Sequence, residues 1–137
     1  MFDSSAIVSV NEERWPKFAP KKCVWERVLD DMTKLAERAE LLNDAITTSP
    51  HLGPQYVLGH TYYFDAAFFA GNWLRGRKSF TSRVFWTKTG RAQPPLIDLW
   101  KLSLEPLLTQ YLAGLEADFA SAERQRLRDV LLHGITT

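Results

Sequence analysis

Residues 21–47 read KKCVWERVLDDMTKLAERAELLNDAIT, and this stretch decides the fold class. Its apolar residues recur every three or four positions while charged residues occupy the others, which is the pattern of an amphipathic helix. The apolar stripe consists of Val24, Trp25, Val28, Leu29, Met32, Leu35, Ala36, Ala39, Leu42 and Ile46. Because proline disfavours helical geometry in the residue before it, Pro50 and Gly53-Pro54 predict that this long helix ends near Thr47.

Three further helices are predicted downstream. Aromatic residues at helical spacing favour a short helix over 60–70, which Gly71 and Gly76 are expected to end. The dipeptide Pro94-Pro95 is typical of a helix start, because proline is tolerated in the first turn of a helix. The leucine-rich apolar stripe that follows it continues to Gly114. Pro106 lies inside that stripe, so this helix is either kinked or broken there. A last amphipathic helix is predicted to about residue 133, with the apolar residues Phe119, Ala122, Leu127, Val130 and Leu131.

The sequence therefore predicts a mostly α protein, a four-to-five-helix bundle. Residues 1–20 are interpreted as an irregular lead-in whose Trp15 and Phe18 dock onto the body, and residues 21–137 as a single helical domain. Residues 79–89 alternate and are rich in β-formers, so a small β-hairpin around 72–92, closing near Gly90, is a further expectation.

Composition narrows the classes of function. The chain has 137 residues, 45% of them hydrophobic, and a net charge of +1, which favours one globular domain over a disordered or globally basic chain. A single cysteine permits neither an intrachain disulfide nor a cysteine-based zinc cluster. No stretch approaches the roughly 20 apolar residues of a membrane span, and no signal peptide is recognisable, so the expectation is a cytoplasmic protein without a membrane partner.

Positive charge gathers in the middle of the chain. Between Ala66 and Ile97 there are six of the 17 basic residues and no acidic one. Basic side chains neutralise phosphates and aromatic rings stack on bases, so this segment is a candidate nucleic-acid-binding surface. Its candidate residues are Arg75, Arg77, Lys78, Arg83, Trp86, Lys88 and Arg91. The alternative is a solvated hairpin whose aromatic rings complete the core.

Catalytic motifs are not recognisable. There is no phosphate-binding loop of the G-x-x-x-x-G-K-[ST] type and no pair of histidines at metal-binding spacing, so no metal site or catalytic residue is predicted and the chain alone is not expected to be an enzyme. An unrecognised site would have only His60, Asp65 and Asp98 to start from. At Gly59-His60-Thr61, the residues by themselves indicate a capped helix start, with Thr61 as N-cap and His60 bound to a buried carbonyl group.

Two phrases add a family resemblance. The first is LGPQYVLGHTYYF at residues 52–64 and the second is WKLSLEPLLTQY at residues 100–111, and both follow a helix that closes on Asn43 and Ile46. In this order, over residues 24 to 132, they resemble the C-terminal helical lid of McrB-type AAA+ GTPases, the motor subunits of modified-cytosine-dependent restriction systems. Thr61 stands where those proteins have serine, and Thr109-Gln110 stands where they have an acidic pair.

The resemblance implies a fold, partners and a site. It implies an AAA+ lid fold in which residues 71–93 are an insertion, with His60 and Thr61 turned toward the nucleotide or the core domain. It implies an AAA+ core domain as partner, in cis or in trans, a homo-oligomeric ring formed through that core, and DNA as the target. GTP and magnesium would belong to the parent motor, a nucleoside triphosphatase, and no cofactor is expected in this chain.

Two functional hypotheses follow. The first is a noncatalytic lid or interaction domain of a McrB-like GTPase in DNA restriction or phage defence. The alternative is a small stand-alone nucleic-acid-binding module that uses the basic and aromatic segment 71–93.

Overall fold

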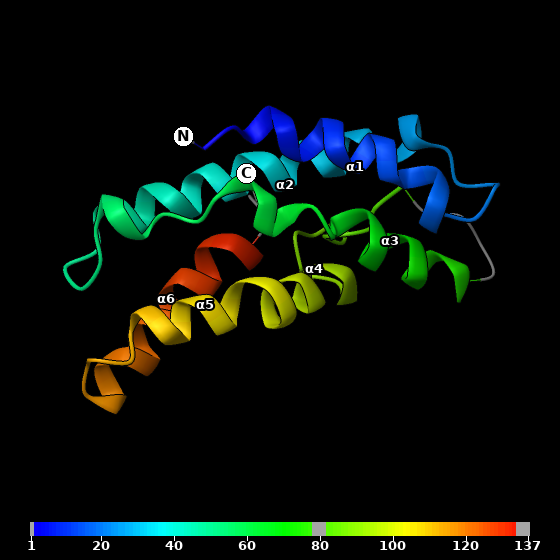
Figure 1. The fold of residues 1–137 in the computed structure, drawn as a ribbon. Coiled ribbons are helices and arrows are strands. Elements are labelled where there is room, and N and C mark those ends of the chain that lie inside the picture. Colours follow the sequence, from blue (N-terminus) through cyan, green and yellow to red (C-terminus); the bar gives the residue numbers. More distant parts are fainter. Residues whose placement is uncertain (1, 78–81, 134–137) are drawn as a thin grey trace.

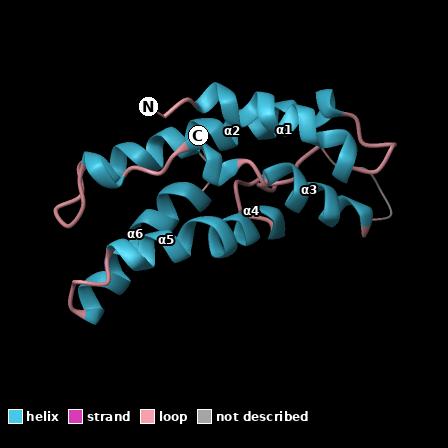
Figure 2. Cartoon of the chain, viewed as in Figure 1, coloured by secondary structure: helices cyan, strands magenta, loops and turns pink. Residues whose placement is uncertain are grey.

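The computed structural model describes residues 2–77 and 82–133, and they form a mostly helical bundle, as the sequence predicted (Figures 1 and 2). The α-helices are α1 (Ser4–Phe18), α2 (Trp25–Thr47), α3 (Ala66–Arg75), α4 (Pro94–Leu99), α5 (Glu105–Tyr111) and α6 (Ala117–Leu132). Two 3₁₀ turns, η1 (Pro54–Tyr56) and η2 (His60–Tyr63), lie between α2 and α3, and a π-helical turn, η3 (Trp100–Leu104), joins α4 to α5.

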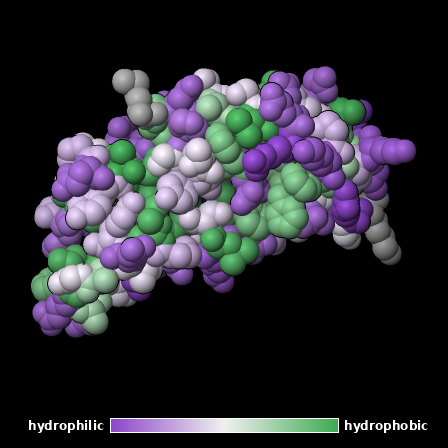
Figure 3. All heavy atoms as spheres, viewed as in Figure 1, coloured by the Kyte–Doolittle hydropathy of each residue, from purple (hydrophilic) through white to green (hydrophobic). Residues whose placement is uncertain are grey.

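Helix α2, the longest, packs against α1 on one side and α6 on the other. Helix α1 lies against both α2 and α3, α3 continues the packing onto α4, and α6 lies against α2 and α5 (Figure 1). The predicted stripe of α2 is buried at Val28, Met32, Leu35, Leu42 and Ile46, which confirms that this face organises the core. Val24 and Leu29, also assigned to the stripe, are 43% and 37% exposed. On the face drawn in Figure 3, hydrophobic residues form separate patches among hydrophilic ones.

The irregular lead-in predicted for residues 1–20 is wrong, because residues 4–18 form α1. Asp3 caps this helix by accepting the backbone N–H of Ser5 at 3.0 Å. Trp15 and Phe18 dock onto the body as expected: the Trp15 indole donates to the carbonyl of Cys23 at 2.8 Å, and Phe18 meets the Phe68 ring edge-on at 5.3 Å between centroids. The helix was missed because its buried stripe has Asn11 at its centre.

Asn11 is buried, and both its side-chain nitrogen and its side-chain oxygen are hydrogen-bonded. Its side-chain amide donates to the carbonyls of Ile7 and Tyr63, at 2.7 and 3.1 Å, and its oxygen accepts the N–H of Ala67 at 2.8 Å. A buried polar group costs little only when it is bonded in this way. Asn11 therefore ties α1 to the turn before α3, although an amphipathicity analysis counts it against a buried face.

Pro106 neither breaks the helix nor leaves it regular. At η3 the backbone N–H of Glu105 bonds to the carbonyl of Trp100, five residues earlier, so the helix widens just before the proline. The wider turn also brings the Trp100 indole to the Glu105 carboxylate, at 2.8 Å. Helix α4, η3 and α5 are thus one continuous helix, and with it the chain has five helices over its described residues.

The hairpin expected around 72–92 is reduced to one isolated antiparallel bridge, Trp86 with Ala92, and no strand forms in the described part of that segment. Its tight turn closes at Gly90, as predicted. Gly90 has a φ of 85°, a left-handed conformation that glycine adopts without strain, and its N–H bonds to the carbonyl of Thr87 at 3.0 Å.

Gly71 does not end a helix, contrary to the prediction, because α3 runs through it to Arg75. Glycine is needed there for close packing: a Cβ atom at this position would lie 2.6 Å from the carbonyl carbon of Phe18 at the end of α1. Gly76, as predicted, follows the last residue of the helix.

Replacing Gly71 by alanine is therefore expected to destabilise the protein by about 1–3 kcal/mol, because the backbone of α1 must move to admit the methyl group. Gly114→Ala is the matched control, since a Cβ there meets no atom within 4 Å. Urea denaturation followed by circular dichroism measures both variants. Equal stability of the two would contradict the close contact between α1 and α3.

Candidate functional site

The Gly59-His60-Thr61 phrase is positioned by the C-terminal part of α2. The side-chain amide of the buried Asn43 donates to the carbonyl of Leu58 at 2.9 Å, and its oxygen accepts the N–H of Leu58 at 2.8 Å. This pair of bonds imitates the pairing of two peptide groups, and it fixes the chain immediately before Gly59. The residues that suggested the family resemblance, 15 positions apart, are thus directly bonded.

The start of η2 differs from the predicted capped helix. Gly59 occupies the capping position with no side-chain hydrogen bond, and Thr61 lies inside the turn with an exposed side chain, so Thr61 is not an N-cap. The turn has only four residues, which is too short for the aligned peptide dipoles that bind anions at longer helices. The capped helix start expected here is therefore a short turn without a side-chain cap.

His60 is half-buried and contacts the N-terminal residues. Its Nδ1 accepts the backbone N–H of Asp3 at 3.4 Å, so its partner is an amide and not the carbonyl expected from sequence. The imidazole also contacts the rings of Phe2 and Phe64, at 6.4 and 5.6 Å between centroids. The surface that this phrase offers to a partner is consequently Thr61 and the 39%-exposed Tyr62, with one side of His60 already covered.

Helix α1 holds the following residues in place as well. Arg14 donates to the carbonyl of Phe64 at 2.9 Å and pairs with the Asp65 carboxylate at 3.4 Å. Tyr63 is fully buried, its hydroxyl has no hydrogen-bond partner among the described residues, and burial raises the pKa of its phenol. The carboxylate of Asp65 is thus paired with Arg14. Asp98, the third residue considered for an unrecognised catalytic site, is exposed on α4.

The two phrases meet each other through their tyrosines. Tyr56, in η1, and Tyr111, at the end of α5, have ring centroids 4.9 Å apart, and η2 packs against η3. Leu58 and Trp100 are both fully buried. The motif residues from three separate stretches of sequence therefore converge in one region of the bundle.

We expect Asn43→Ala to destabilise the protein by about 2–4 kcal/mol, because it leaves the N–H and carbonyl of Leu58 buried without partners. Asp44→Ala is the control, since the adjacent Asp44 is exposed and should change stability by no more than about 0.5 kcal/mol. Chemical denaturation of the two variants checks the difference. An equally small effect of both would show that the Asn43 pair does not hold residues 58–64.

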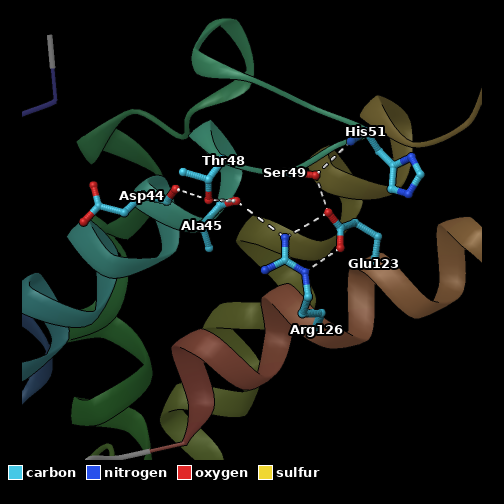
Figure 4. A network of polar contacts seen from close by, with 7 residues as sticks. All are labelled: Asp44, Ala45, Thr48, Ser49, His51, Glu123 and Arg126. Carbon is cyan, nitrogen blue, oxygen red and sulfur yellow. Dashed lines mark hydrogen bonds and ion pairs between the residues drawn. The ribbon is translucent and has the colours of Figure 1, made fainter.

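A second polar network joins the end of α2 to α6 (Figure 4). Glu123 is buried, accepts from the Ser49 hydroxyl, and pairs with Arg126 through two hydrogen bonds of 2.6 and 2.9 Å. Arg126 also reaches the carbonyl of Ala45, at 3.5 Å. The hydrogen bond from Arg126, supported by that from Ser49, lowers the pKa of Glu123 although burial opposes the change.

Because the folded state lowers this pKa, the stability that Glu123 contributes is full above its ordinary value of 4.5 and is lost as the pH falls through the lower folded value. Glu123→Gln should cost about 1–3 kcal/mol at pH 7, and the difference from wild type should shrink at pH 3. Urea denaturation at both pH values tests this, with the exposed Glu13→Gln as control. A difference that is constant with pH would contradict the assigned role.

The residues of the basic segment lie in separate places. Arg75 and Arg77 lie at the end of α3, where Arg75 reaches the carbonyl of Lys17 at 3.4 Å and the Arg77 guanidinium lies 4.4 Å from the centre of the Trp73 ring. Lys78 lies outside the described residues. Arg83 and Lys88 instead line a pocket against α2, and Arg91 lines a neighbouring hollow.

Trp86 does not offer a ring face for stacking on bases. It is 3% exposed and its indole donates to the carbonyl of Leu132 at 2.9 Å, while the neighbouring Val84 and Phe85 are fully buried. This agrees with the alternative in which the aromatic residues complete the core. Any contact with nucleic acid here would be made by cationic side chains.

Sequence reasoning missed three cations near this segment: Lys34 and Arg38, which line the same pocket as Arg83 and Lys88, and Arg128, beside Arg91. The sequence contained one indication of these missed cations. Asp31 and Arg38 are charged residues beside the apolar stripe of α2, seven positions apart and on the same side of the helix. A charge in such a position requires a specific partner or ligand.

A metal site and a membrane-spanning helix each have requirements that can be compared with the described residues. Within residues 2–77 and 82–133, no three histidine, cysteine, aspartate or glutamate side chains are grouped so that they could hold a metal ion. In the same residues, no helix combines the length and the apolar character needed to cross a membrane. No protein-family model, no curated protein and no solved structure matches the chain.

Proposed function

We propose that this chain is a noncatalytic lid or interaction domain of a McrB-like AAA+ GTPase that acts in DNA restriction or phage defence in the cytoplasm. The observation that carries the proposal is the bond pair between Asn43 and Leu58. It joins the end of the long helix to the Gly59-His60-Thr61 phrase, so residues that the resemblance depends on act as one structural unit. The contact between Tyr56 and Tyr111 adds the second phrase to that unit.

In this proposal the partner is an AAA+ core domain, in cis or in trans, which would bring GTP, magnesium and the ring of subunits. The contact surface is the exposed Thr61 and Tyr62 next to His60. The chain itself supplies no catalytic group: Thr61 and Tyr62 meet the core domain, and the buried Asn43 bonds transmit a displacement of that surface to α2.

The alternative, a stand-alone nucleic-acid-binding module, is favoured by one observation, the gathering of cations around the turn at 83–91. The burial of Phe85 and Trp86 removes these two rings from base stacking, so residues 83–91 offer their cations for contacts to phosphates.

The test begins with the natural gene. The reading frame that contains this chain is expected to encode a phosphate-binding loop upstream, or a neighbouring gene is expected to do so. In the assembled GTPase, Thr61→Arg should reduce GTP turnover at least tenfold, because a bulky charge is placed on the proposed contact surface. Ser121→Arg also replaces an exposed hydroxyl side chain by arginine, but on α6, and should leave turnover unchanged.

Absence of a phosphate-binding loop from the frame and from its neighbours would overturn the proposal. Equal turnover in the Thr61 and Ser121 variants would overturn the assigned contact surface. Circular dichroism of both variants distinguishes a lost contact from a lost fold.

A further inference from the structure

A small pocket lies between α2 and the turn that follows residue 82. Its volume is about 130 Å³, and the residues that line it include Lys34, Arg38, Arg83, Trp86, Thr87 and Lys88. Sites for whole small molecules usually measure roughly 300–1,000 Å³, so this pocket suits a single chemical group and not an entire nucleotide.

The fold brings the four cations together in two ways. Lys34 and Arg38 are four residues apart on α2 and therefore share a face of that helix. The turn is held against the same helix by Asp31, whose carboxylate accepts the N–H groups of Val84 and Phe85 at 2.9 and 2.6 Å. Arg83 and Lys88 lie on either side of these fixed residues.

Three of the four cations in the pocket are not neutralised by an ion pair. Lys34, Arg38 and Lys88 make none with any residue in the described part of the chain. One carboxylate, that of the exposed Glu37, also lines the pocket, against four cations. Asp31 is nearby: its Oδ2 accepts the two backbone amides, and its charge also attracts Lys34 without forming an ion pair.

Arg38 is the cation of the pocket whose charge is least compensated by the protein. Its Nη2 donates to the carbonyl of Val130, but its Nε is buried and has no acceptor among the described residues. Burial lowers the pKa of this guanidinium, and no carboxylate offsets the effect. A buried donor without an acceptor costs about 1–3 kcal/mol, so Arg38 adds an uncompensated positive charge beside the pocket.

We propose that this pocket binds a phosphate group. A phosphate supplies several acceptor oxygens and a negative charge, which match guanidinium and ammonium donors converging from different sides. The group belongs either to the backbone of a nucleic-acid strand or to free phosphate. A second basic hollow favours the strand, because it shares Gly90 with the pocket and includes Arg91 and Arg128, so that successive phosphates could follow the turn. This site is independent of the proposed lid role.

The test uses the full chain and two probes: a fluorescein-labelled single strand of 20 thymidines, followed by anisotropy, and inorganic phosphate, followed by calorimetry. The double variant Lys34→Glu with Lys88→Glu changes two exposed cations of the pocket. It should weaken strand binding at least tenfold and lower the salt dependence of the affinity by about the amount expected for two phosphate contacts. Lys17→Glu with Lys21→Glu makes the same change of net charge at two exposed positions near the end of α1 and should alter binding by less than twofold.

Strand binding that depends on the pocket would identify a nucleic acid as the source of the phosphate. Binding of inorganic phosphate alone, lost in the pocket variant, would identify free phosphate. Binding of neither probe, or equal weakening in the pocket and control variants, would overturn the proposal. Lys34→Gln with Lys88→Gln repeats the comparison with neutral side chains, and thermal denaturation confirms that each variant is folded.

Discussion

The two hydrogen bonds between the Asn43 side chain and the backbone of Leu58 are the constraint on which the arrangement of this protein depends. They fix where the chain returns after α2, and so decide where η2 meets α1 and where α3 begins. Asn11 and Asp31 use the same device, because each satisfies backbone groups of a segment that has no regular partner of its own. Three buried polar side chains on two helices therefore specify the path of the non-helical chain, while apolar residues of α2 and of the helices around it supply the core.

The sequence predicted what depends on regular apolar spacing and missed what depends on polar contacts. Helix α2 and the helical class followed from the stripe, and the turn at Gly90 followed from the alternating residues before it. Helix α1 was missed because Asn11 lies at the centre of its buried face, and Gly71 was taken as a helix end although it is a packing position. These errors share a cause: both residues are explained by neighbours more than 50 positions away in the chain.

At the candidate sites, too, the local residues could be predicted from the sequence and their distant contacts could not. His60 and Thr61 could be selected from a local phrase, but their surroundings could not, since Phe2 and Asp3 come from the other end of the domain. The proposed phosphate pocket could be predicted only in part. Arg83 and Lys88 belong to the basic segment, whereas Lys34 looks like an ordinary solvated residue of a long helix and Arg38 is marked only by its place beside the apolar stripe. The two surfaces are built from different elements, η2 for the proposed core contact and α2 with the 83–90 turn for the phosphate, so neither role requires the other.

The π-helical turn at Trp100–Leu104 explains how one helix keeps five buried residues in line. Leu96, Trp100, Leu104, Leu108 and Leu112 are spaced by four, and on a regular α-helix each such step drifts by about 40° around the axis. The wider turn rotates less per residue and cancels part of that drift. Such a turn is equivalent to one residue inserted into an α-helix. Homologues with one residue fewer between positions 100 and 105 would then keep both halves of the helix facing the core, and an alignment gap of one residue at this point would mark the loss of the π turn.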